Sequence, residues 1–185
     1  MKFTLNYRGP LRPNGSPADK HAIRLLFHRQ LEVLWTQLPL REYASLLGQP
    51  RLALGLTPLI EDHHGIRFAP LVSSNIHFAA EVHVTLLRKD EPGKLFSQAG
   101  DLDNRLKTLL DALKIPHEAT ALPKDYVHDP AIDPFYCVLQ DDSLVTALSV
   151  RTERLLDPTL PDLDVVALVE IHTIQLRATI ATIGL

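Results

Sequence analysis

Residues 101–113 read Asp-Leu-Asp-Asn-Arg-Leu-Lys-Thr-Leu-Leu-Asp-Ala-Leu, and this stretch decides the fold. Its leucines, at 102, 106, 109, 110 and 113, recur at the spacing of one face of an α-helix. Pro116 follows and suits the end of a helix. The segment therefore predicts an amphipathic helix that packs its leucine face on a sheet.

Strands are predicted on both sides of this helix. Residues 2–8 and 78–86 alternate apolar and polar side chains, which is typical of strands with one covered face. Residues 144–152 and 165–176 are rich in Val, Ile, Leu and Thr, with two prolines in the gap between them. We expect these last two to form a closing antiparallel pair.

A second helix is expected from about Pro17 to Leu38. Pro17 and Asp19 suit its start, and Pro39 suits its end. Trp35, near the end of this helix, is expected in the core or in a dimer interface.

The segments that remain predict less regular structure. Residues 51–72 favour an extra hairpin turning at residues 62–65, and Pro58 and Pro70 would confine it to a sheet edge. Residues 115–140 contain four prolines and predict a long loop.

The elements together predict an α/β (α+β) fold in a single small domain over residues 1–185. Its mixed four-stranded sheet carries two main helices, in the order strand, helix, strand, helix, strand, strand, plus the extra hairpin. The length of 185 residues is enough to bury a core of its own.

Composition narrows the class of protein. No uninterrupted apolar run reaches the roughly 18 residues that span a bilayer, and the first residues lack the apolar core of a secretory leader. We therefore expect a cytoplasmic protein with no membrane partner. Cys137 is the single cysteine, which excludes an intramolecular disulfide and a cysteine-rich zinc site.

Charge is unevenly spread along the chain. Residues 1–60 hold eight Lys/Arg against three Asp/Glu, a net of +5, while the rest hold eleven against nineteen, a net of −8. One interpretation is that the basic part faces DNA phosphates while carboxylates elsewhere hold a metal. The alternative is an ordinary mixed surface.

Acidic residues gather at the predicted helix and beyond the loop. Asp101 stands at the helix start, Asp103 and Lys107 lie one turn apart, and residues 140–145 read Gln-Asp-Asp-Ser-Leu-Val. Mg²⁺ prefers oxygen ligands of this kind, and a metal held by them can activate water for attack on a phosphodiester. Taken singly, the same residues also serve as helix caps, ion pairs and turns.

The pattern Asp-x-Asp-Asn-x-x-Lys, followed by an apolar helix with Asp-Ala-Leu and then Asp-Asp before a strand, resembles the RusA family of Holliday-junction resolvases. The resemblance implies a homodimer that nicks branched DNA, such as a four-way junction, with Mg²⁺ or Mn²⁺. It assigns Asp101, Asp103 and Asp142 as metal ligands and Lys107 as a further catalytic residue, and it leaves Asp141 open. The alternatives are a non-catalytic DNA-binding or structural relative and a metal-dependent nuclease for other nucleic acids.

Histidines are expected to be structural. His63 and His64 are explained by the hairpin turn, and Glu81 and His83 share a polar strand face that we expect to meet solvent. The chain has no glycine-rich phosphate loop, nucleophile elbow or dinucleotide fingerprint.

Overall fold

A computed structural model describes residues 1–48, 59–89, 101–161, 164–178 and 182, and it confirms the predicted α+β class. The elements in chain order are β1 (Lys2–Pro10), α1 (Pro17–Trp35), η1 (Leu40–Leu47), β2 (Glu61–His63), β3 (Ile66–Val72), η3 (Ser74–Ile76), β4 (Phe78–Arg88), α2 (Asp101–Leu113), η5 (Ala119–Ala121), β5 (Phe135–Leu139), η6 (Asp142–Leu144), β6 (Val145–Arg154) and β7 (Asp164–Gln175).

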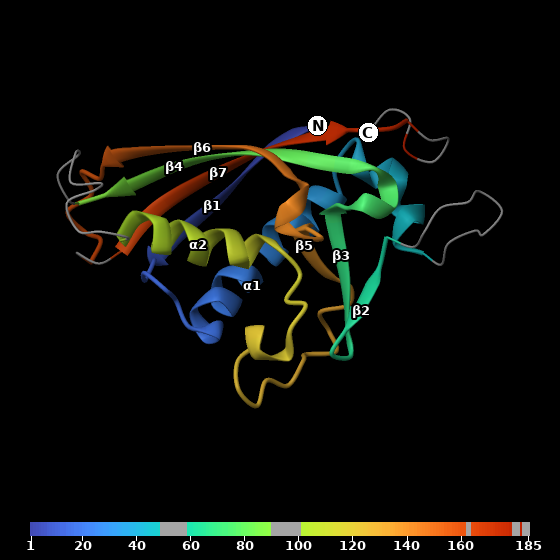
Figure 1. The fold of residues 1–185 in the computed structure, drawn as a ribbon, viewed down its shortest axis with the longest axis horizontal. Coiled ribbons are helices and arrows are strands. Elements are labelled where there is room, and N and C mark those ends of the chain that lie inside the picture. Colours follow the sequence, from blue (N-terminus) through green and yellow to red (C-terminus); the bar gives the residue numbers. More distant parts are fainter. Residues whose placement is uncertain (49–58, 90–100, 162–163, 179–181, 183–185) are drawn as a thin grey trace.

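The four predicted strands form one mixed sheet in the order β1-β7-β4-β6. β7 pairs antiparallel with β1 and β4, and β6 pairs parallel with β4. Both helices lie on the same face of this sheet (Figure 1). Among the described residues, neither α1 nor α2 lies on the opposite face, which we call the open face.

The expectation that the last two strands pair with each other was wrong. β4 lies between β6 and β7 and pairs with both of them. A parallel pair needs a long crossover connection, and the chain between β4 and β6 supplies one that contains α2. The residue pattern of a strand does not identify the strand with which it pairs, which is why the expected pairing of β6 with β7 was wrong.

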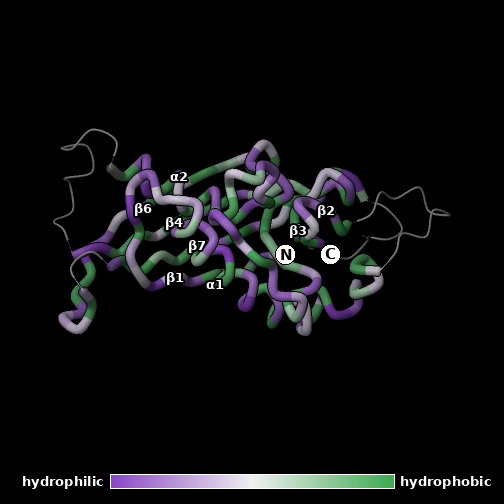
Figure 2. The backbone as a smooth tube through the Cα atoms, turned by 90° about the horizontal axis from the view of Figure 1, so that it is seen from below, coloured by the Kyte–Doolittle hydropathy of each residue, from purple (hydrophilic) through white to green (hydrophobic). Residues whose placement is uncertain are grey.

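Alternation along the strands decides which side chains face the helices. The apolar set of β4 is buried as predicted, at Phe78, Ala80, Val82, Val84 and Leu86. The residues between them are less buried from Glu81 onward, because they point to the open face. Hydrophilic and hydrophobic colours succeed one another along the sheet strands (Figure 2).

α1 begins where the sequence predicts. Ser16 caps it, and Asp19 completes a capping box with that serine. The helix ends at Trp35, three residues before the expected end, and Thr36 caps it. The Trp35 side chain is buried, which confirms its expected place in the core.

A second, three-stranded sheet has the order β2-β3-β5. It confirms the hairpin, whose turn holds His64 and Gly65 at positive φ. It also corrects two expectations, since residues 115–140 contain the strand β5 and β3 is the middle strand. Pro70 is tolerated there because β2 pairs only with the first three residues of β3. Pro58 lies outside the described residues.

Arg24 connects the two helices. The residue is 2% exposed, and its guanidinium donates hydrogen bonds to the backbone oxygens of Asp111 (3.0 Å) and Lys114 (3.3 Å) at the end of α2. Carbonyls at a helix end lack partners within the helix and favour a cation. Burial lowers the pKa of Arg24 to about 10, so the side chain stays charged at neutral pH.

Arg24→Met keeps most of the side-chain volume and leaves these carbonyls unpaired. We expect the free energy of unfolding to fall by about 2–4 kcal/mol, measured by urea denaturation. Arg29→Met, at an exposed position of the same helix, is the matched control and should change it by less than about 0.5 kcal/mol. Equal stability of the two variants would contradict the role given to Arg24.

A buried histidine beside Arg24 makes stability depend on pH. Burial first, and then the neighbouring Arg24, lower the pKa of His21 from 6.5 to about 4. In the unfolded chain this residue takes up a proton at a higher pH than in the folded chain. Its contribution to stability is therefore full above about pH 6.5 and is lost as the pH falls toward 4.

The free energy of unfolding should consequently fall between pH 7 and pH 5, measured by urea denaturation. His21→Gln keeps an acceptor for Arg24 and should show a smaller fall over the same interval. An identical fall in the variant and the wild type would show that His21 is not responsible.

Candidate functional site

The start of α2 presents part of the predicted site to solvent. Asp103 and Lys107 are both exposed and lie one helical turn apart, as the sequence predicts. Asp101 is the first residue of α2, and its side chain lies outside the described part of the structure. The exposed Asp103 and Lys107 can therefore meet a ligand from the same side.

The chain between β1 and α1 holds the other side of α2 in place. The Thr108 hydroxyl accepts a hydrogen bond from the Gly15 amide (2.8 Å), and Asn14 donates to the backbone oxygen of Asn104 (3.4 Å). Arg105 donates to the backbone oxygen of Leu11. These contacts fix the rotation of α2, so that Asp103 and Lys107 remain on its outer border.

A second group of charges lies at the other end of α2. Lys114 Nζ is 2.6 Å from Asp142 Oδ2 and 3.8 Å from Asp111 Oδ1, and Lys20 Nζ is 2.8 Å from Asp111 Oδ2. The ion pairs form a chain, Lys20–Asp111–Lys114–Asp142, that links α1, α2 and η6. Asp142 belongs to this group, and its side chain is 59% exposed.

A half-open cleft of about 230 Å³ lies beside this group. Its polar lining comes from Lys20, Arg24, Asp111, Lys114, His117 and Glu118. Asp141 lies next to one of these lining residues, with Oδ2 3.9 Å from His117 Nε2. Hydrogen bonds from the Ser143 side chain and backbone lower the pKa of Asp141, which therefore stays ionised at neutral pH. Asp141 caps η6, a structural role for the residue that the sequence left open.

The structure does not bring all the predicted ligands together within one chain. Ten residues of helix separate Asp103 from Leu113, so about 15 Å lies between their Cα atoms. Asp142 lies at the far end, next to Lys114. Asp101, Asp103 and Asp142 therefore remain a prediction as a ligand set, and one chain in this conformation does not bring Asp103 and Asp142 to one ion.

Sequence reasoning missed the residues that surround Asp142. Asp111 and Lys114 are three residues apart, a spacing that predicts neighbours on a helix, so this pair could have been predicted from the sequence. The contact of Lys20 with Asp111 could not have been predicted, because only the packing of α1 against α2 brings the two residues together.

Four of the nine histidines lie in two polar groups. His63 pairs with Glu61 on β2, with Nε2 3.1 Å from Oε2, and His64 occupies the turn, in accord with a structural role. Glu81 and His83 lie half-exposed on the open face, and His172 of β7 joins them there. Within the described ranges, Glu81, His83 and His172 are the one group of three or more such side chains whose ligand atoms approach closely enough for a metal ion.

No protein-family model, curated protein or solved structure matches this chain significantly. None of the helices among the described residues is long and apolar enough to cross a membrane. Any assignment of function therefore depends on the chain's own residues.

Gly15 is needed for the close approach to α2. A Cβ at this position would lie 2.6 Å from Thr108 Cγ2. We expect Gly15→Ala to lower the free energy of unfolding by about 1–3 kcal/mol, measured by urea denaturation. Adding Thr108→Ser removes that methyl group and keeps the hydroxyl, so the double variant should recover part of the loss. Simple addition of the two single effects would contradict the proposed clash.

Proposed function

We propose that this protein is a magnesium-dependent endonuclease that nicks branched DNA. The observation that carries the proposal is the exposed Asp103–Lys107 pair directly after Asp101 at the start of α2. These residues stand in the order Asp-x-Asp-Asn-x-x-Lys, which resembles the RusA resolvases. α2 lies in the connection between the parallel strands β4 and β6. This order of strands and helices agrees with the fold that the resemblance implies, and so it supports the proposed nuclease function.

The chemistry requires a cation and a positive side chain near one phosphate. Carboxylates of Asp101 and Asp103 would hold Mg²⁺, which keeps several of its waters when few protein ligands bind it. Such an ion lowers the pKa of a bound water and stabilises the charge that develops on the phosphodiester. Lys107, one turn further on, would neutralise the same phosphate.

We further propose that two copies of the chain complete each site. Asp142 lies beside Lys114, at the opposite end of α2 from Asp103, and its side chain is 59% exposed. The helix between Asp103 and Leu113 is about 15 Å long. In a symmetric dimer, residue i of one chain meets residue j of the other, and the reverse contact also forms. Asp103 of one copy and Asp142 of the other can then bind one ion, which gives two equivalent sites.

The proposed DNA cleavage is tested with a labelled four-way junction, a matched duplex and a single strand, each with Mg²⁺ or with EDTA. We expect metal-dependent nicks confined to the junction, and a rate about 100-fold or more lower for Asp103→Asn. Asp62→Asn, at an exposed position of β2, is the matched control and should cleave like the wild type. Absence of cleavage of every substrate with Mg²⁺ and Mn²⁺ would refute the enzyme and favour a non-catalytic protein, and preference for another substrate would refute the junction as target.

The shared site is tested by mixing two inactive variants. Asp103→Asn and Asp142→Asn chains, each inactive alone, should regain activity when unfolded and refolded together. In a mixed dimer, one site carries both substitutions and the other carries neither. That dimer should nick one strand of the junction, measured on denaturing gels. If each site lay within one chain, every site would carry a substitution and no activity would return.

A further inference from the structure

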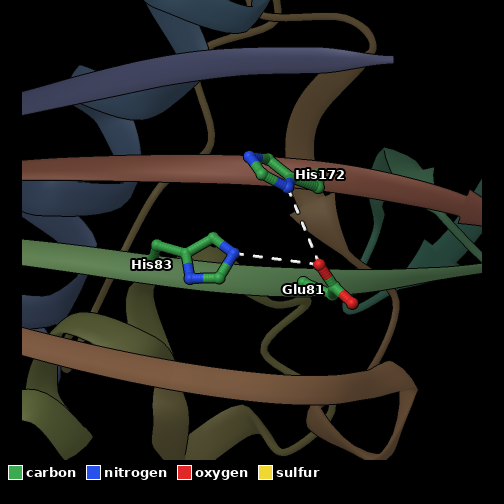
Figure 3. Close-up of side chains that lie close together, drawn as sticks. All are labelled: Glu81, His83 and His172. Carbon is green, nitrogen blue, oxygen red and sulfur yellow. Dashed lines mark ion pairs between the residues drawn. The ribbon is translucent and has the colours of Figure 1, made fainter.

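The open face carries a compact group of three polar side chains. Glu81 and His83 lie two residues apart on β4, and His172 lies directly opposite Glu81 on the antiparallel neighbour β7. All three point to the same side of the sheet, and the Glu81 carboxylate reaches toward both rings (Figure 3). The side chains are 30–39% exposed, so an ion from solution can reach them.

Both rings converge on one oxygen. Glu81 Oε2 is 3.8 Å from His83 Nε2 and 3.7 Å from His172 Nδ1 (Figure 3). Zinc bonds of about 2.0–2.1 Å in a tetrahedron place neighbouring ligand atoms about 3.3 Å apart. These two separations exceed this value by about half an ångström, and all three ligand atoms lie within 4.8 Å of one another, so side-chain movements would admit an ion.

The far nitrogen of each ring is held by another side chain. His172 Nε2 donates to Glu170 Oε1 at 2.9 Å, and Lys2 Nζ lies 3.1 Å from that same oxygen. His83 Nδ1 is 2.6 Å from Ser149 Oγ of β6. Metal-binding histidines have such partners, because a hydrogen bond from one nitrogen fixes the tautomer and directs the lone pair of the other.

This arrangement gives the region between the two rings a negative electrostatic potential. Nε2–H of His172 donates its hydrogen bond to Glu170. The Nδ1 of a neutral His172 therefore carries a lone pair, which faces the Glu81 carboxylate. Two acceptors at 3.7 Å repel unless a cation or a proton lies between them. Two neutral imidazoles and one carboxylate are ligands for a divalent transition metal, whereas Mg²⁺ selects oxygen.

We propose that Glu81, His83 and His172 form a binding site for a divalent transition-metal ion, with zinc as its probe. Three protein ligands leave a fourth position that faces solvent and takes water. Ser149 and Glu170 act as positioning residues for the two rings. The site shares no residue with the magnesium site proposed on α2, and the two proposals can fail independently.

Zinc titration followed by calorimetry tests the site. The wild type should bind one Zn²⁺ per chain here, and His172→Ala and Glu81→Gln should each weaken that binding by more than about tenfold. His64→Ala removes an exposed histidine on the β2–β3 turn and is the matched control, which should bind like the wild type. Bound Co²⁺ should show the intense visible absorption of four-coordinate geometry.

Ser149→Ala provides a second test that does not alter a ligand. Its position on the edge strand β6 is exposed, so folding should survive, and circular dichroism checks it. We expect zinc affinity to fall about 10–100-fold, as for other partners of metal-bound histidines. Wild-type protein that binds no zinc, or binding unchanged in both His172→Ala and Glu81→Gln, would overturn the proposal whatever the result of the cleavage assays.

Discussion

The pairing of β4 with β6 on one side and β7 on the other is the constraint on which the rest of the structure depends. Because β6 runs parallel to β4, the chain between them must return along the length of the strands, and α2 forms part of that return. The start of α2 and the start of β6 consequently lie at opposite ends of the helix. The antiparallel pairing of β4 with β7 places Glu81 across from His172 on the other face.

Polar groups inside the helical layer hold α2 in one orientation. At its end, the buried Arg24 pairs with backbone carbonyls, and near its middle the Thr108 hydroxyl accepts a hydrogen bond from the Gly15 amide. Both contacts join segments far apart in the sequence. Together they set which border of α2 meets solvent, and so they position Asp103 and Lys107 without touching them. Buried acceptors and donors of this kind are costly to leave unpaired, which makes the orientation specific.

Sequence periodicity predicted the local elements well and their partners poorly. The leucine spacing of α2 and the alternation of β1 and β4 follow from burial on one face. Such burial sets the period at which apolar residues recur in the sequence. The antiparallel pairing expected of β6 and β7 failed because strand pairing depends on the whole sheet. β5 was missed because it is short and lies among prolines. The Asp103–Lys107 pair could be predicted from helix geometry, whereas His172 could not be joined to Glu81 without the β4–β7 register.

Because α2 keeps Asp103 and Asp142 at opposite ends, we propose that one ion takes ligands from two copies of the chain. The most direct measurement is the anomalous scattering of Mn²⁺ in crystals of the protein. We predict an ion bonded to Asp103 of one copy and to Asp142 of another. An ion bonded to Asp103 and Asp142 of the same copy, or to only one of these two residues, would show that the site is not shared between two copies.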